Sequence, residues 1–141
     1  MAMTIRIDVV SAEAEIFSGA ATMVFAPAEM WEVCITPRHS PLLARLKPGE
    51  VRVQMSTGEE QFFYVSGGFL EVQPHVITVL ADTAIRAKDI DEAAAERAKE
   101  NAERAMADKK SDFDYAKAQV EFAEAVAQLR TLQKLRARAK R

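Results

Sequence analysis

The chain lacks several features that would assign it to a familiar class of protein. Among its 141 residues there is one cysteine, Cys34, so no disulfide forms within the chain, which fits a reducing compartment. The longest mainly apolar stretch, residues 20–28, is far shorter than the roughly 20 residues that a membrane-spanning helix needs. No basic segment followed by an apolar stretch begins the chain, so we expect no signal peptide. We therefore expect no direct insertion into a membrane.

A strong excess of one charge is also missing, because the net charge is −2. This value gives no reason to expect a nucleic-acid partner. The charges are nevertheless unevenly distributed. Residues 1–88 carry 10 acidic and 7 basic side chains, residues 89–129 carry 11 and 6, and residues 130–141 carry none and 6. The basic C-terminal segment therefore needs an explanation of its own.

Glycine and proline are both absent after residue 88, although the chain has five of each. Before that point, TIRIDVV alternates apolar and polar residues as a half-buried strand does, and EVRVQMS, EQFFYVS, FLEVQ and HVITVLA follow. Thr57-Gly58 and Pro74 provide turns between these short segments. Residues 1–88 are therefore predicted to form an antiparallel β-sandwich or flattened barrel.

Residues 89–141 have the composition of helices, since alanine is interleaved with Glu, Lys and Arg. Asp89 or Asp91 is suited to cap a first helix, and the polar run DKKSDFD is predicted to be a turn. Ser111 or Asp112 would start the second helix. We predict that residues 89–141 form a two-helix antiparallel hairpin after the β domain.

The two helices are expected to meet largely through small side chains. The residues predicted at their contact are Ala94, Ala98, Ala102, Tyr115, Phe122, Val126 and Leu129. At about 25 cal/mol per Å² of buried apolar surface, such a contact contributes a few kcal/mol at best, which is little against the entropy of ordering two helices. The hairpin is therefore either a device that detaches or changes shape, or a rigid appendage.

The stretch WEVCITPRHSPLL, residues 31–43, gathers side chains capable of chemistry. A zinc site needs three or four ligands, and Cys34 and His39 have no second pair, so we expect no metal and no cofactor. His39 followed by Ser40 leaves a small hydrolase as an alternative, although no third catalytic residue is in view. The preferred interpretation is a surface loop that is shaped by its prolines and is open to contact with a partner.

The chain ends in the basic segment LRTLQKLRARAKR. Its cations are Arg130, Lys134, Arg136, Arg138, Lys140 and Arg141. Positive charge near a helix C-terminus is favourable in itself, but six cations without an acid exceed what the helix dipole needs. The candidate partners are nucleic-acid phosphates, an anionic membrane and an acidic protein surface. A nucleic-acid-binding module is thus an alternative, which the acidic remainder of the chain disfavours.

Three blocks, MAMTIRIDVVSAEAEIFSG, PRHSPLLARLKPG and VSGGFLEVQPHVITVLADTAIRAKDIDEA, resemble the epsilon subunit of the bacterial F-type ATP synthase, and the resemblance covers nearly the whole chain. It implies a non-catalytic subunit of the rotating central stalk at the cytoplasmic face of the bacterial inner membrane. Such a subunit binds gamma and sits on the ring of c subunits. Its C-terminal helices extend along gamma, reach the alpha and beta subunits and inhibit ATP hydrolysis. A structural coupler without inhibition is the alternative.

The resemblance also assigns residues to the c-ring contact. The family loop GELGIxPGHxPLL carries a Glu and a His that face the polar loops of the c ring, and these match Glu32 and His39. Three family glycines are replaced here by Trp31, Cys34 and Arg38. Any of the three that adopts a positive φ would strain the loop.

Some family members bind ATP on the hairpin through the motif (I/L)DxxRA. Here the motif begins with Ile90 and Asp91, but its arginine position is Ala94. The arginine positions of the second helix fall on Glu124 and Gln128. Loss of these cations predicts weak or absent ATP binding. The same resemblance makes the basic C-terminal segment complementary to an acidic segment of the catalytic beta subunit.

Overall fold

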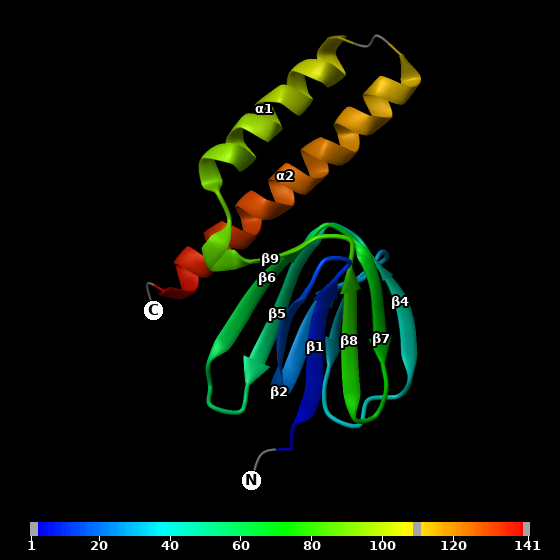
Figure 1. Cartoon of the computed structure of the whole chain (residues 1–141), viewed down its shortest axis with the longest axis vertical. Helices are drawn as coiled ribbons and strands as arrows, with labels where there is room; N and C mark the ends of the chain where they lie inside the picture. Colours follow the sequence, from blue (N-terminus) through cyan, green and yellow to red (C-terminus); the bar gives the residue numbers. More distant parts are fainter. Residues whose placement is uncertain (1–2, 109–110, 140–141) are drawn as a thin grey trace. The chain divides into compact units, whose positions relative to one another are not determined.

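The computed structural model describes residues 3–108 and 111–139 (Figure 1). The chain divides into two compact units, Met1–Arg86 and Ala87–Arg141. In the described residues, the first unit holds the strands and the second holds the helices. Two cations of the predicted basic segment, Lys140 and Arg141, lie outside the described residues.

The first unit, the β unit, is a single sheet that folds around one hydrophobic core. Its strands are β1 (Ile5–Ser11), β2 (Glu15–Pro27), β3 (Glu32–Ile35), β4 (Leu42–Leu46), β5 (Gly49–Met55), β6 (Glu60–Val65), β7 (Gly68–Val72), β8 (Val76–Ala81) and β9 (Ala84–Arg86). They are connected in the order β4-β7-β8-β1-β2-β5-β6-β9, with β3 paired to β2. The predicted antiparallel sheet needs one correction, because β8 returns beside β1 in the parallel direction.

The alternation in the sequence produces the core of this unit. In β1, Ile5, Ile7 and Val9 are at most 1% exposed, whereas Arg6 between them is exposed. The inward positions of the other strands supply Val24, Val51, Val53, Phe63, Val65, Leu70, Val72, Ile77 and Val79. Burial of these branched and aromatic side chains is the main stabilisation of the unit.

Four of the nine strands in the described residues, β2, β3, β4 and β9, were not predicted by the sequence. β2 pairs with β1 through its first half and with β5 and β3 through its second half, so it connects the two parts of the folded sheet. Its residues 19–21, GAA, interrupt any regular alternation. The predicted surface loop over residues 31–43 also needs correction, because Glu32–Ile35 forms β3 against the end of β2.

The glycines after β6 allow a close approach between strands. Gly67 and Gly68 have φ angles of 133° and 126°, which side chains disfavour. A Cβ atom at Gly68 would collide with the carbonyl oxygen of Leu80 on β8. The other predicted turn, Thr57-Gly58, connects β5 to β6, with Gly58 at φ 91°.

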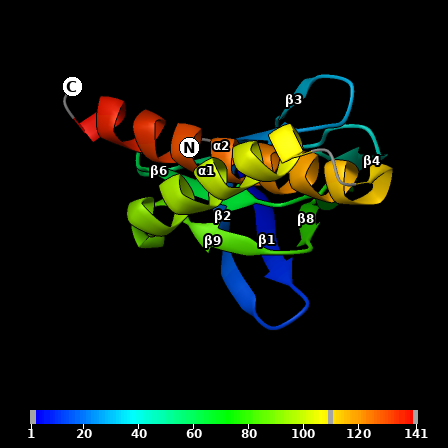
Figure 2. The ribbon, with the colours of Figure 1, turned by 90° about the horizontal axis from the view of Figure 1, so that it is seen from above.

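The second unit, the helical unit, begins with the 3₁₀ turn η1 (Ala87–Asp89) and continues with α1 (Glu92–Asp108) and α2 (Asp112–Ala139). Asp91 caps α1, since its Oδ1 accepts from the Ala94 N–H at 3.1 Å. Ser111 caps α2 through a 3.1 Å bond from the Asp114 N–H. Figures 1 and 2 show the two helices side by side. The predicted fold class, a β-sandwich domain followed by a helical hairpin, is confirmed.

The contact between the helices differs in part from the predicted one. Its most buried residues are Ala95, Ala102, Ala118, Ala125, Ala127, Thr131 and Leu132. Of the predicted residues, Ala102 is buried, Ala98 and Tyr115 are exposed, and the others are half-buried: Ala94, Phe122, Val126 and Leu129. On α1 the buried position is Ala95 where Ala94 was predicted. A shift of one residue along a helix turns the buried face by about 100° around the helix axis. Within the described residues, no helix is long and apolar enough to cross a membrane.

Candidate functional site

The two residues assigned to a ring contact lie at opposite ends of one short strand. Glu32 is the first residue of β3, opposite Pro27 of β2, and its side chain is exposed. His39 lies in the turn that follows the other end of β3 and is half-buried. The structure therefore does not bring these two side chains into one spot. A partner that contacts both must extend along the length of β3.

The turn that carries His39 has an unusual backbone. The His39 N–H donates to the Thr36 carbonyl at 3.2 Å, which places Pro37 and Arg38 at the two central positions. Arg38 has φ 64°, and it is the only non-glycine residue with a positive φ among residues 3–108 and 111–139. A glycine would accept this angle freely, whereas an L-residue with a side chain loses about 1 kcal/mol or more. Of the three replaced family glycines, Arg38 is therefore the one that is strained.

The imidazole of His39 is oriented by its neighbour. Nδ1 lies 2.7 Å from the main-chain carbonyl oxygen of Ser40. A carbonyl oxygen only accepts, so Nδ1 carries a proton in this hydrogen bond. This bond is to the main chain of Ser40 and not to its hydroxyl. It therefore gives the hydrolase alternative no nucleophile–base pair.

Metal chemistry has no support in the part of the chain that the structure describes. No group of three His, Cys, Asp or Glu side chains there is placed to hold a metal ion. Cys34 lies on β3 opposite Phe25 and is a free thiol. Burial raises the pKa of this thiol, against the opposing effect of the Arg52 guanidinium, so Cys34 stays protonated at neutral pH.

An exposed apolar patch, which the sequence reasoning missed, lies on the outer face of β4, β7 and β8. Leu43, Phe69 and Leu80 are 72%, 45% and 48% exposed. Phe69 pairs with Leu80 across β7 and β8, and with Arg45 across β4 and β7. The Arg45 guanidinium lies 5.8 Å from the centre of the Phe69 ring. The signal was present in FLEV and VLA, where apolar residues are adjacent instead of alternating, so that both faces of the strands are apolar.

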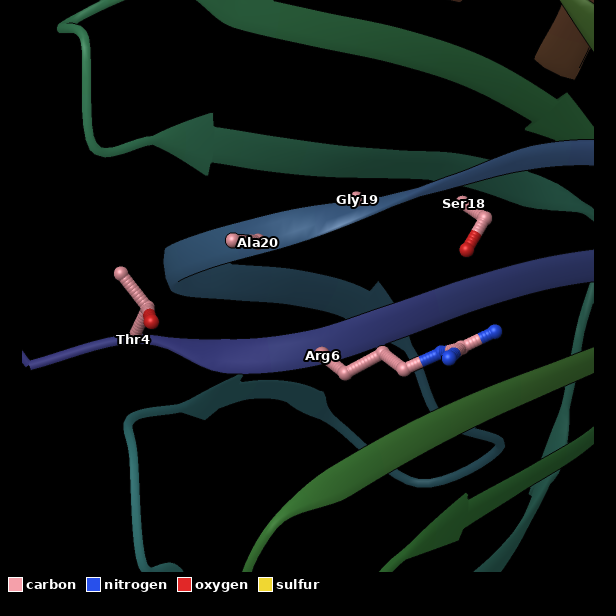
Figure 3. A pocket seen from close by; sticks show the side chains of 5 residues that line it. All are labelled: Thr4, Arg6, Ser18, Gly19 and Ala20. Atoms are coloured by element: carbon pink, nitrogen blue, oxygen red, sulfur yellow. The ribbon is translucent and has the colours of Figure 1, made fainter.

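A shallow hollow of about 330 Å³ lies over β1 and β2 (Figure 3). It is lined by Thr4, Arg6, Ser18, Gly19 and Ala20. The polar groups beside it already have partners, because Asp8 accepts from Arg6 Nε at 3.1 Å and from the Ser18 hydroxyl at 2.7 Å. The charged groups beside the hollow are therefore paired with each other.

In the helical unit, Arg136 of the basic segment forms an ion pair with Glu92. The Arg136 guanidinium donates to both carboxylate oxygens of Glu92, at 3.0 and 2.6 Å, and so connects the end of α2 to the first turn of α1. These hydrogen bonds lower the pKa of Glu92 and raise that of Arg136. Arg130, Lys134 and Arg138 have exposed side chains on α2.

The positions of the family ATP motif, Ile90, Asp91 and Ala94, supply no cation. Ile90 is 8% exposed, and the Asp91 carboxylate caps α1. Ala94 supplies no cation at the arginine position, and Glu124 and Gln128 are half-buried on α2. The helical unit thus presents an alanine and an acid where phosphate recognition needs arginines.

Comparison with known proteins accounts for both units. Residues 4–87 match the beta-sandwich domain of the ATP synthase delta/epsilon chain, and residues 88–133 match its long alpha-helix domain. The chain belongs to the ATP synthase delta/epsilon chain family. It is 66% identical over 136 residues to the ATP synthase epsilon chain of Nitrosococcus oceani, covering 96% of this chain and 97% of that one. It is 64% identical over 137 residues to that of Thioalkalivibrio sulfidiphilus, covering 96% and 97%.

A solved structure shares the fold of this family member. The similar chain belongs to the Euglena gracilis mitochondrial ATP synthase, in a structure described as OSCP, F1 and c-ring. The TM-score is 0.82 at 18% identity, and the match covers 92% of this chain and 81% of that chain. Family membership confirms the resemblance found in the sequence, and it confirms a non-catalytic subunit of the ATP synthase complex.

Proposed function

We propose that this chain is a central-stalk rotor subunit of a proton-translocating F-type ATP synthase. Its β unit joins the gamma subunit to the c ring, and its helical unit restrains ATP hydrolysis. The observation that carries the proposal is the 66% identity to an ATP synthase epsilon chain over 96% of this chain. Such a subunit works peripherally, at the cytoplasmic face of the bacterial inner membrane.

The apolar patch on β4, β7 and β8 supports a contact with gamma. Three large apolar side chains that are 45–72% exposed on adjacent strands cost free energy in water unless a partner covers them. The patch lies on a sheet with a continuous core, so its shape persists whether or not the partner is present. Replacing Phe69 and Leu80 by Ser should abolish co-purification with gamma while leaving the fold intact, because neither side chain belongs to the core.

The strand β3 and its following turn support the contact with the c ring. Glu32 supplies an exposed carboxylate at one end, and His39 supplies an oriented ring at the other. In a Glu32→Gln/His39→Ala double variant, we expect proton-driven ATP synthesis to fall while ATP hydrolysis persists, which is the signature of lost coupling. Glu59→Gln, which removes an exposed carboxylate from the β5–β6 turn, is the matched control. Unchanged ATP synthesis in the double variant would contradict the c-ring assignment.

The helical unit supports a regulatory role through its charge. Exposed cations on the last turns of α2 suit an acidic surface on the catalytic alpha and beta subunits. If this attraction holds the inhibitory form, raising the salt concentration should weaken inhibition, because exposed charges are screened within about 10 Å at 0.1 M salt. Inhibition that does not change with salt would assign the contact to apolar residues of α2 instead.

A further inference from the structure

The strained turn Thr36–His39 has a feature that the family resemblance does not explain. Pro37 presets the turn, and the position after it, which favours glycine, holds Arg38 at φ 64°. The turn is fixed on both sides: the His39 N–H donates to the Thr36 carbonyl at 3.2 Å, and the Arg38 N–H donates to the Pro74 carbonyl at 3.1 Å. The backbone therefore does not relax around Arg38, and the strain persists in the folded protein.

Nothing within the described chain repays this strain. Arg38 is exposed, and the ion pairs found among residues 3–108 and 111–139 do not include it. Its guanidinium also lies over no aromatic ring there. A side chain that strains its own backbone without an internal contact indicates a function outside the chain.

The surroundings define the chemistry of the partner. The bond to Pro74 places the turn beside the β7–β8 turn, where His75 is exposed and its carbonyl accepts from the Arg6 N–H at 3.3 Å. Arg38 and His75 thus come from separate turns at one end of the β unit. The Arg38 guanidinium is cationic and is therefore complementary to an anionic surface, and a guanidinium binds a carboxylate through two hydrogen bonds.

We propose that Arg38 is a specificity-determining contact residue whose guanidinium binds a carboxylate on the membrane ring. This inference rests on the proposed function, since it names a further residue of the same ring contact. Arg38 and His39 are adjacent in the turn, so a loop that meets the His39 ring also lies within reach of Arg38. The strain is then the cost of directing a cation at this partner from a turn that a glycine would form more easily.

The test compares stability with binding in the full chain. Arg38→Gly removes both the strain and the charge, so Tm should rise by about 4 °C, while binding to an ATP synthase complex depleted of its epsilon chain should weaken by about fivefold at low salt. Arg38→Asn, which tolerates positive φ, should lose the same binding. Arg38→Lys should keep most of it. Lys47→Asn, which removes an exposed cation between β4 and β5, should change neither quantity.

The outcomes separate the inference from its premises. An Arg38→Gly variant that gains stability and keeps full affinity would show that the strain has no role in binding, and so would overturn the proposal. An unchanged Tm would overturn the premise of strain. Binding to protein-free vesicles of anionic lipid is the second measurement. If Arg38→Gly weakens that binding as much as it weakens binding to the depleted complex, the anion is a lipid phosphate, and the carboxylate assignment is overturned. Wild-type chain that fails to rebind the depleted complex would instead contradict the proposed function itself.

Discussion

The β unit and the helical unit of this chain are stabilised by different kinds of side chain. The largest fully buried residues, among them Tyr64, Phe63 and Ile7, all lie in the β unit. The helical unit buries mainly alanines, with Leu132 as its largest buried side chain apart from Ile90. Burial of branched and aromatic side chains stabilises a fold by much more per residue than burial of methyl groups. Burial therefore stabilises the β unit by more per residue than it stabilises the hairpin.

Substitution of one buried leucine in each unit should give the largest difference in stability between the two units. Leu70→Ala, at a position that is 0% exposed in the β unit, should lower the free energy of unfolding by about 3–4 kcal/mol. Leu132→Ala, which is 8% exposed in the hairpin, should cost only about 1–2 kcal/mol. Near-ultraviolet circular dichroism of the buried Tyr64 follows the β unit during urea unfolding, while circular dichroism at 222 nm follows the helices. One shared transition, shifted equally by both substitutions, would contradict the comparison.

The ion pair between Glu92 and Arg136 gives a smaller effect that is confined to the hairpin. Because the folded pKa of Glu92 is lowered, the pair stabilises the closed hairpin above the ordinary carboxyl pKa of about 4.3, and this contribution is lost as pH falls through the folded value. Amide hydrogen exchange in the last turns of α2 should therefore speed up in acid relative to neutral pH, after correction for intrinsic rates. Glu92→Gln should show the faster exchange at neutral pH already, and the exposed Glu96→Gln should not. Equal amide exchange rates in the Glu92→Gln and Glu96→Gln variants would show that the ion pair does not stabilise the hairpin.

The last prediction concerns ATP, which we expect the chain not to bind. With Ala94 at the arginine position of the ATP motif, calorimetry of the full chain with ATP should detect no micromolar association. Ala94→Arg is the informative companion variant, since it restores one cation on an exposed turn of α1. Micromolar binding by the unmodified chain would show that other residues replace the missing arginines.

Local pattern predicted much of this fold, and the failures have physical causes. Strands with strict alternation of apolar and polar residues, such as β1 and β5, were predicted because one face of each strand is buried and the other faces solvent. β2 was missed because it belongs to both parts of the folded sheet and so changes its buried face along its length. The choice of cap, Asp91 over Asp89 and Ser111 over Asp112, depended on where the first turn of each helix begins.

The candidate site was less predictable than the fold. The sequence indicated that a glycine replacement would strain the β3–β4 connection, but only the backbone shows that the strain falls on Arg38 and not on Trp31 or Cys34. The separation of Glu32 from His39 by a strand depends on the pairing of β3 with β2, which is a long-range contact. Adjacent apolar residues in FLEV and VLA indicate strands that are apolar on both faces, but only the register between β4, β7 and β8 places Phe69 and Leu80 side by side.

The most direct test of the account is ATPase activity of an epsilon-depleted catalytic core, titrated with residues 1–141 and with residues 1–88. The shorter form retains every residue of the hydrophobic core of the β unit. We predict that the full chain inhibits hydrolysis, whereas residues 1–88 bind with similar affinity and do not inhibit. If both forms bind and neither inhibits, the hairpin is not a brake, and the chain is a structural coupler whose basic segment has another purpose.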